Sequence, residues 1–188
     1  ATEDVNMNIH MASTCLHYGQ EVFEGLKAFR GADGKVRLFR VDENAKRMIN
    51  SGEYLKMAVP SVELFTKACI EAVKLNADYI PPYGSGASLY LRPMLIGVGP
   101  QVGVKPSADY LFAVFVTPVG PYYKDGFNCI KVIIDYDHDR AAPKGTGHVK
   151  VGGNYAASLD SGEIAHQKGF ASVIFLDPAT KQYIDECS

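Results

Sequence analysis

The sequence lacks the long apolar run of a membrane-spanning helix and a strong excess of charge of either sign. No apolar stretch reaches the roughly 20 residues that cross a bilayer. The formal net charge is -2 with both signs interspersed, so no broad basic field favours nucleic acid or an anionic membrane. The start, ATEDVNMNIH, is unlike a signal peptide. We therefore expect small-molecule chemistry in the cytoplasm.

Cysteine is scarce, and its spacing excludes two kinds of site. The four cysteines are Cys15, Cys69, Cys129 and Cys187, and they form no C-x-x-C pair. Neither a structural zinc site nor a disulfide scaffold is therefore indicated. The five histidines are scattered without metal-ligand spacing, and internal repeats and low-complexity tracts are absent. We expect reduced thiols and no metal.

What is present is the composition of an ordinary globular protein. Of 188 residues, 47% are apolar, which is enough for a core in one large or two small domains. Residues 21–29 and 35–40 predict two strands of a hairpin, because the Asp33-Gly34 pair between them is a strong turn signal. The first part of the chain therefore begins with β-structure.

Two helices are predicted next. Asp42 is expected to cap the first, over residues 43–57, and Ser61 the second, which carries Glu63 in its first turn. The second helix has a helical apolar stripe, formed by Leu64, Phe65, Cys69, Ile70 and Val73. Helices after a hairpin indicate an α+β domain.

Three β-rich runs follow, over residues 87–98, 109–120 and 129–137. The middle run is apolar enough for the centre of a sheet. Pro, Gly and mixed charge around the third run predict a crossing between two domains, which we place at residues 123–137.

After the crossing, residues 154–167 predict a helix and residues 170–177 a strand, while YIDEC at 183–187 begins another strand. One helix and the first residues of a last strand do not complete the layers that bury a sheet. We therefore expect a fragment of a longer protein, with a truncated second domain over residues 138–188.

Lys150 is a candidate for chemistry because Val149, Val151, Gly152 and Gly153 surround it. Desolvation by such neighbours favours the neutral, nucleophilic form of an amine, which makes Schiff bases. A surface lysine in a loop is the ordinary alternative. The glycines also suggest a phosphate-binding nucleotide loop, but Val-Gly-Gly follows this lysine where that motif needs Ser or Thr.

Five stretches occur in the order of a known family: HYGQEVFEGLKAFRG, SLYLRPMLIG, RAAPKGTGHVK, KVGGNYAASL and YIDEC. With them the chain resembles the branched-chain-amino-acid aminotransferases, fold type IV enzymes that use pyridoxal 5'-phosphate (PLP). The resemblance covers nearly the whole chain. It implies a two-domain α+β fold lacking both termini, with a small N-terminal domain at 1–122 and the start of the PLP-binding domain at 138–188.

The resemblance implies four cofactor-binding residues. Lys150 matches the lysine that bonds to PLP and moves the substrate's Cα proton, and Tyr155 matches the tyrosine that contacts the cofactor's phenolic oxygen. Arg47 matches the arginine that grips the phosphate, and Glu186 the carboxylate at the pyridine nitrogen. From the residues alone, the last three have ordinary explanations in packing or solvated surface.

The resemblance also places Tyr18, Phe23, Tyr90 and Arg92 near the substrate. Tyr90 and Arg92 share one face of a strand. An aromatic lining suits leucine, isoleucine and valine, and Tyr18 and Arg92 are candidates for holding the γ-carboxylate of glutamate. Core or surface packing is the alternative for all four.

The implied function is transamination of branched-chain L-amino acids with 2-oxoglutarate, by a homodimer or larger homo-oligomer. The alternatives are another fold type IV enzyme, such as a D-amino-acid aminotransferase or aminodeoxychorismate lyase, and a non-catalytic remnant. If residues 1–188 are the whole molecule, we expect poor PLP binding and little turnover, because one arginine under-satisfies a phosphate dianion.

Overall fold

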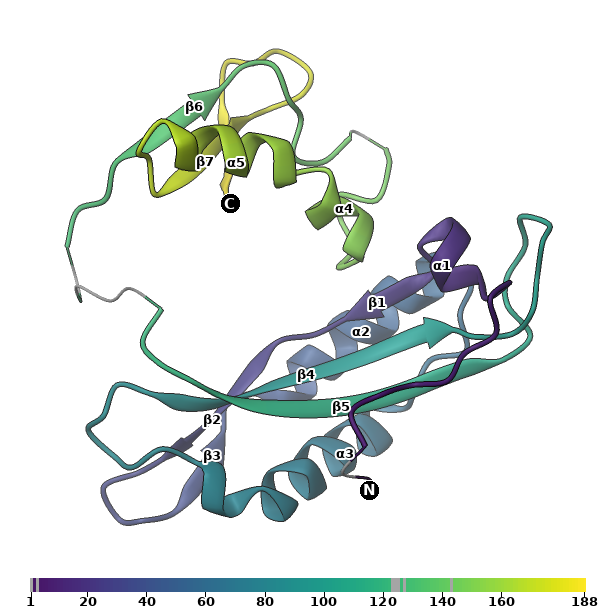
Figure 1. The fold of residues 1–188 in the computed structure, drawn as a ribbon, viewed down its shortest axis with the longest axis vertical. Helices are drawn as coiled ribbons and strands as arrows, with labels where there is room; N and C mark the ends of the chain where they lie inside the picture. Colours follow the sequence, from purple (N-terminus) through teal and green to yellow (C-terminus); the bar gives the residue numbers. More distant parts are fainter. Residues whose placement is uncertain (1, 3, 123–125, 127, 143) are drawn as a thin grey trace. The chain divides into compact units, whose positions relative to one another are not determined.

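The structure of the chain is a computed structural model that describes residues 2, 4–122, 126, 128–142 and 144–188 (Figure 1). The chain divides into two compact units, residues 1–119 and 120–188. Each unit contains its own sheet and helices. In the described part of the chain, no helix combines the length and the apolarity needed to cross a membrane.

The sheet of the first unit is built around β4 (Ser88–Gly97). The other strands are β1 (Glu21–Phe23), β2 (Leu26–Arg30), β3 (Val36–Leu38) and β5 (Tyr110–Val119). β4 pairs with β1, β2 and β5, every pairing in the sheet is antiparallel, and β3 pairs with β2. β2, β3 and the turn at Asp33-Gly34 confirm the predicted hairpin.

The prediction that residues 109–120 form the centre of the sheet is wrong. β5 contacts β4 along ten residue pairs and forms an edge of the sheet, whereas β4 and β2 each have neighbours on both sides. The side chains of β5 are half-buried or exposed, and Phe115 is an exposed one. An apolar run indicates burial in general, but it does not reveal which strand becomes central.

The strand predicted over residues 21–29 is interrupted between β1 and β2, at Glu24 and Gly25. The pairing register with β4 is the same on both sides of the break, since Phe23 faces Met94 and Leu26 faces Leu91. Pro93 lies opposite Glu24 in this register and has no N–H to donate, although its carbonyl accepts from the Glu24 N–H at 2.8 Å. The proline therefore interrupts the ladder without shifting it.

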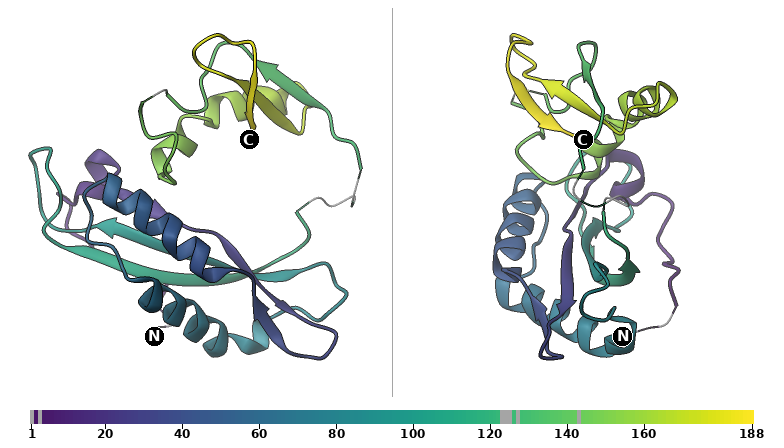
Figure 2. Two further views of the ribbon diagram at one scale, coloured as in Figure 1. Left: turned by 180° about the vertical axis from the view of Figure 1, so that it is seen from behind. Right: turned by 90° about the vertical axis from the view of Figure 1, so that its left-hand side faces the viewer.

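Two helices, α2 (Val41–Tyr54) and α3 (Val62–Leu75), lie on one face of this sheet (Figure 2). Their buried residues include Met48 on α2 and Phe65 on α3. Two shorter helices are α1 (Thr14–Tyr18) and the 3-10 helix η1 (Ala77–Tyr79). Leu89 and Leu91 of β4 are buried, so alternation along the strand places Tyr90 and Arg92 on the opposite, open face.

The helix caps test two local predictions. The side chain of Ser61 accepts from the Leu64 N–H at 3.1 Å, which confirms the predicted cap of α3. α2 instead begins one residue earlier than Asp42, with Arg40 in the left-handed conformation as its N-cap. Asp42 lies in the first turn, where a carboxylate still interacts favourably with the helix dipole.

The second unit contains a three-stranded sheet of β6 (Val132–Asp135), β7 (Ser172–Leu176) and β8 (Ile184–Cys187). β6 and β7 are parallel, and β7 and β8 are antiparallel. β6 lies within the β-rich run predicted over residues 129–137 and belongs to this unit's sheet. The predicted interdomain crossing at residues 123–137 stays a prediction, and its residues 123–125 and 127 lie outside the described residues. Ala165, Val173 and Phe175 form a buried core of this unit, where the sheet packs against the helix that carries Ala165.

Between β6 and β7 the chain forms α4 (Gly152–Ala156) and α5 (Leu159–Gln167), not the single helix predicted over residues 154–167. The Ser158 hydroxyl donates to the Tyr155 carbonyl at 2.8 Å at the break. A serine that bonds to the backbone in this way competes with the helical ladder. The break leaves α4 as a short helix of its own directly after Lys150.

Candidate active site

Lys150 and Tyr155 contact each other in the second unit. The Lys150 ammonium Nζ contacts the Tyr155 hydroxyl and lies 4.6 Å from the centroid of its ring. Val149 and Val151 are buried on either side of Lys150, which anchors the backbone and directs the lysine side chain the other way. Lys150 itself is half-buried. A lysine whose amine contacts a phenol in this way differs from an ordinary loop lysine that only contacts solvent.

Asn154, a buried residue of α4, fixes the loop that leads to Lys150. Its side-chain Nδ2 donates to the carbonyls of Thr146 and Val149, at 2.7 and 2.9 Å. Its Oδ1 accepts from the Thr146 hydroxyl at 2.6 Å. Sequence reasoning missed this residue, although it lies within the GGNYA stretch that we used for the resemblance. The loop is therefore held by hydrogen bonds to one side chain.

Arg140 connects Glu186 to this pair, and sequence reasoning missed it too. Its Nε lies 2.8 Å from Glu186 Oε1 on β8, and its guanidinium carbon lies 4.9 Å from the centroid of the Tyr155 ring. Its Nη1 also donates to the Asn154 carbonyl at 2.9 Å. The Arg140 side chain is only 11% exposed. A single guanidinium thus joins the carboxylate predicted for the pyridine nitrogen to the tyrosine beside Lys150.

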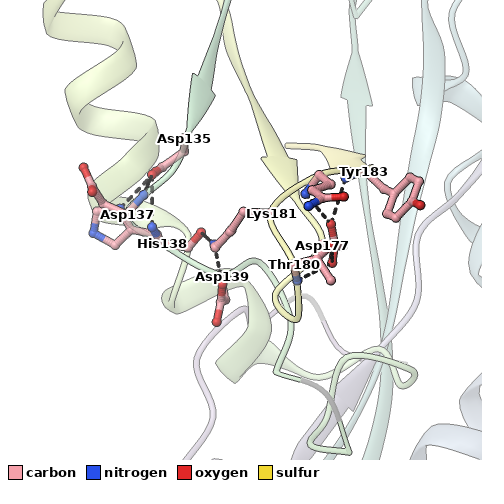
Figure 3. Close-up of polar contacts among 9 residues, drawn as sticks. Asp135, Asp137, His138, Asp139, Asp177, Thr180, Lys181 and Tyr183 are labelled. Carbon is pink, nitrogen blue, oxygen red and sulfur yellow. Dashed lines mark hydrogen bonds and ion pairs between the residues drawn. The ribbon is translucent and has the colours of Figure 1, made fainter.

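The segment that carries Arg140 is tied to the turn between β7 and β8 (Figure 3). Lys181 Nζ lies 2.5 Å from Asp139 Oδ1 and donates to the His138 carbonyl at 3.0 Å. Lys181 has a φ of 57°, a left-handed conformation that is uncommon for a long side chain. These contacts hold the residues before Arg140 against the turn that leads to Glu186.

His138 forms a second tie, between the end of β6 and α5. Its Nδ1 lies 2.9 Å from Asp135 Oδ2 and its Nε2 lies 3.3 Å from Asp160 Oδ2. Burial alone would raise the pKa of Asp135, but hydrogen bonds, including those from the backbone N–H groups of Asp137 and His138, outweigh it and lower that pKa to about 2. Asp135 is therefore a structural carboxylate that stays ionised at neutral pH.

Asp177 organises the turn between β7 and β8 (Figure 3). Its carboxylate accepts from the backbone N–H groups of Tyr183, Gln182 and Thr180 at 2.7–2.8 Å, and from the Thr180 hydroxyl at 2.8 Å. These bonds, led by that from Tyr183, hold the pKa of Asp177 well below its usual range. The charged carboxylate therefore stabilises the turn.

We predict that Asp177→Asn lowers the melting temperature of the protein at neutral pH and that the difference shrinks in acid. Because the folded-state pKa is depressed, the stabilisation is present above the unfolded pKa of about 3.9 and is lost as the pH falls through and below it. Melting curves of both proteins over this pH range measure the effect. A difference that does not depend on pH would show that the charge is not what matters.

A cavity of about 480 Å³ lies beside Glu186. Its lining includes Ala141, Gly147, His148 and Glu186. The volume is within the range of small-molecule sites, roughly 300–1,000 Å³. Glu186 is the one predicted cofactor residue among those that line it, and Lys150 and Tyr155 are not in the lining.

Arg47, the predicted phosphate ligand, lies on α2 in the first unit and holds a buried carboxylate. Its Nε and Nη2 lie 2.6 and 2.7 Å from the two oxygens of Glu24, whose side chain is 0% exposed. Asn44 Nδ2 donates to Glu24 Oε2 at 2.8 Å. Two nitrogens of the guanidinium are therefore already bonded to Glu24. The proposed contact of Arg47 with the cofactor phosphate stays a prediction.

Three of the four predicted substrate residues meet on the open face of the first sheet. The Tyr90 hydroxyl accepts from Arg92 Nε at 3.0 Å and from Arg92 Nη2 at 2.8 Å. The Arg92 guanidinium carbon also lies 4.6 Å from the centroid of the Phe23 ring. Tyr18 is held differently: it ends α1, and its hydroxyl contacts the carbonyl of Val102.

Comparison with known proteins gives consistent matches. The family model for amino-transferase class IV matches residues 21–188. A branched-chain-amino-acid aminotransferase of Haemophilus influenzae is 53% identical over 190 residues, covering 98% of this chain and 55% of the relative. One of Helicobacter pylori is 54% identical over 181 residues, covering 96% and 53%.

A solved structure is also similar. The branched-chain amino acid aminotransferase of Escherichia coli aligns with a TM-score of 0.76 and 28% identity, covering 96% of this chain and 56% of that one. This chain therefore spans about half the length of the proteins it matches.

Proposed function

The chain belongs to the class IV aminotransferases, and from that premise we propose that the protein containing it transfers the amino group of leucine, isoleucine or valine to 2-oxoglutarate. The predicted family and the α+β fold class of the fold type IV enzymes are confirmed by the family match and by the solved structure. Because the chain is about half as long as its relatives, the activity of the whole protein is part of the proposal.

The observation that carries the proposal is the set of contacts in the second unit that leads from Lys150 through Tyr155 and Arg140 to Glu186. PLP chemistry needs an amine that bonds to the aldehyde, a phenol beside that amine, and a carboxylate that holds the ring nitrogen. Lys150 and Tyr155 are only five residues apart, but Glu186 comes from β8, a strand that begins at Ile184. Their convergence favours a cofactor site over a remnant in which the motifs serve only packing.

We infer that PLP is the cofactor, held by Lys150, Tyr155, Glu186 and Arg47. When bound, PLP supplies an electron sink for the electrons released at the substrate Cα. Lys150 would hold the cofactor's aldehyde through its amine, and the same amine would serve as the base for the Cα proton of the substrate. The Tyr155 hydroxyl, which contacts that amine, would orient it and would hold the phenolic oxygen of the cofactor. Glu186, fixed by Arg140, would hold the ring nitrogen of the cofactor.

The open face of the first sheet supports the assignment of substrate residues. Phe23 and the ring of Tyr90 offer apolar surface for a branched side chain, and Arg92 offers a guanidinium for a carboxylate. Among the described residues, no acidic side chain lies within ion-pair distance of Arg92. Tyr18 is a further proposed contact to the γ-carboxylate of glutamate.

The proposal includes a cytoplasmic location and assembly as a homodimer or larger homo-oligomer, both expected from the family resemblance. Light scattering on the purified complete protein tests the assembly, and cell fractionation tests the location. A monomer with full activity would contradict the expected assembly.

A substrate panel tests the proposed reaction. With 2-oxoglutarate, the complete protein is expected to convert L-leucine, L-isoleucine and L-valine at least about tenfold more efficiently than D-alanine. The measurement is kcat/KM from glutamate formation. A preference for D-alanine would favour the D-amino-acid aminotransferase alternative, and a protein that binds PLP without converting any amino acid would favour the remnant.

A further inference from the structure

Gly25 lies beneath Tyr90 on the open face of the first sheet. In the register shared by β1 and β2, position 25 is opposite Arg92, so a side chain there would point to the same face as Tyr90 and Arg92. A Cβ at this position would lie 2.5 Å from the Tyr90 hydroxyl and 3.2 Å from Cε2 and Cζ of its ring. The tyrosine therefore occupies the space that a side chain at position 25 would fill.

The Tyr90 hydroxyl placed in this way fixes Arg92. It accepts from both Nε and Nη2 of Arg92, while the Phe23 ring lies against the guanidinium. In the described part of the chain, Arg37, Arg40, Arg47 and Arg140 each pair with an acidic side chain, and Arg30 donates to two backbone carbonyls. Arg92 has no such partner within these ranges and is held by a neutral hydroxyl and a ring instead. Its charge is thereby available to an anionic ligand.

Alanine at position 25 would displace the tyrosine and leave the backbone in place. The three atoms nearest to its Cβ belong to the tip of the Tyr90 side chain. The φ of Gly25 is outside the left-handed region, so an alanine adopts this backbone without strain. The expected consequence is a moved hydroxyl, and with it a moved Arg92, in a protein that still folds.

We propose that Gly25 is a positioning residue that sets the place of Arg92 through Tyr90 and thereby sets the affinity for the dicarboxylic substrate. The proposal rests on the proposed function and deepens it, because it makes the second carboxylate of glutamate and 2-oxoglutarate the group that depends on position 25. Monocarboxylic substrates with apolar side chains do not need the Arg92 charge in the same place. Position 25 therefore governs the balance between the two substrate classes.

The test uses the complete PLP-bound protein and two unreactive probes, glutarate and 4-methylvalerate. Gly25→Ala is expected to weaken glutarate binding about tenfold and to change 4-methylvalerate binding by less than about twofold. The KM for 2-oxoglutarate should rise about tenfold while kcat changes little. The control is Gly162→Ala, where an added Cβ meets nothing within 4 Å; it should leave both affinities unchanged.

A double-mutant cycle with Tyr90→Phe separates positioning from a general structural effect. Because the phenylalanine of that variant lacks the hydroxyl that the Cβ meets, Gly25→Ala should weaken glutarate binding much less in that background. Additive effects, equal losses for the two probes, or unchanged glutarate binding in a folded Gly25→Ala protein would each overturn the proposal. So would a wild-type protein that does not bind glutarate.

Failure of the proposed function has a different signature. In that case the wild-type protein converts no branched-chain amino acid, whereas the binding cycle with glutarate still reports how position 25 acts on Tyr90 and Arg92. A crystal structure of Gly25→Ala gives a direct readout. A Tyr90 hydroxyl that keeps its place and its bonds to Arg92 would overturn the proposal.

Discussion

Replacing Lys150 with alanine is expected to lower kcat for leucine transamination by about 10⁴-fold or more in the complete protein. On our proposal, the variant loses both the amine that would bond to PLP and the base that would move the Cα proton, and each of these roles contributes several orders of magnitude. The contact of Lys150 Nζ with the Tyr155 hydroxyl makes this lysine the candidate for both tasks. Single-turnover kinetics with leucine measure the loss.

The matched control is Lys168→Ala, which removes an exposed lysine at the end of α5 in the same unit. It should leave kcat within about twofold of wild type, since surface substitutions away from special features have small effects. A folded Lys150→Ala protein that keeps more than about a tenth of the wild-type rate would remove Lys150 from the mechanism.

Replacing Arg47 with alanine is expected to destabilise the protein by about 2–3 kcal/mol, because it leaves the fully buried Glu24 without its cation. We place the loss below that for a fully buried pair because the Arg47 side chain is 55% exposed. Urea unfolding of the complete protein, followed by circular dichroism, measures the change. In the same variant, PLP affinity tests the predicted contact with the phosphate.

Two controls test whether the loss comes from the buried carboxylate of Glu24 or only from removing a positive charge on α2. Lys46→Ala removes the neighbouring cation of α2, whose pair with Glu43 at 2.6 Å is exposed, and should change stability little. Adding Glu24→Gln to Arg47→Ala should recover part of the loss, because the uncompensated charge is gone. Equal losses for Lys46→Ala and Arg47→Ala would contradict a special role of the buried carboxylate.

Local signals in the sequence predicted part of the local structure, although the Asp42 cap and the single helix over residues 154–167 were wrong. The Asp33-Gly34 turn and the Ser61 cap each depend on residues within a few positions of one another, and both are confirmed. Which strand becomes central depends on pairing between distant segments. For that reason the apolar run that forms β5 was assigned to the centre, whereas β4 has neighbours on both sides.

The difference between local signals and long-range contacts also applies to the candidate site. The family motifs led to Lys150, Tyr155 and Glu186. In the structure Arg140 contacts Tyr155 and Glu186, and Tyr155 contacts Lys150. Arg140 could not be assigned from the sequence, because its role depends on a strand that begins more than 40 residues later. Glu24 was missed for the same reason, since its partner Arg47 lies on a different element.

The most direct test of the central claim is to identify the lysine that carries PLP in the complete protein. Borohydride makes the bond between PLP and a lysine amine permanent, and mass spectrometry of the digested protein then locates the pyridoxyl group. We expect the group on Lys150 in stoichiometric amount. A pyridoxyl group on another lysine, or a folded protein that carries none after incubation with PLP, would contradict the claim.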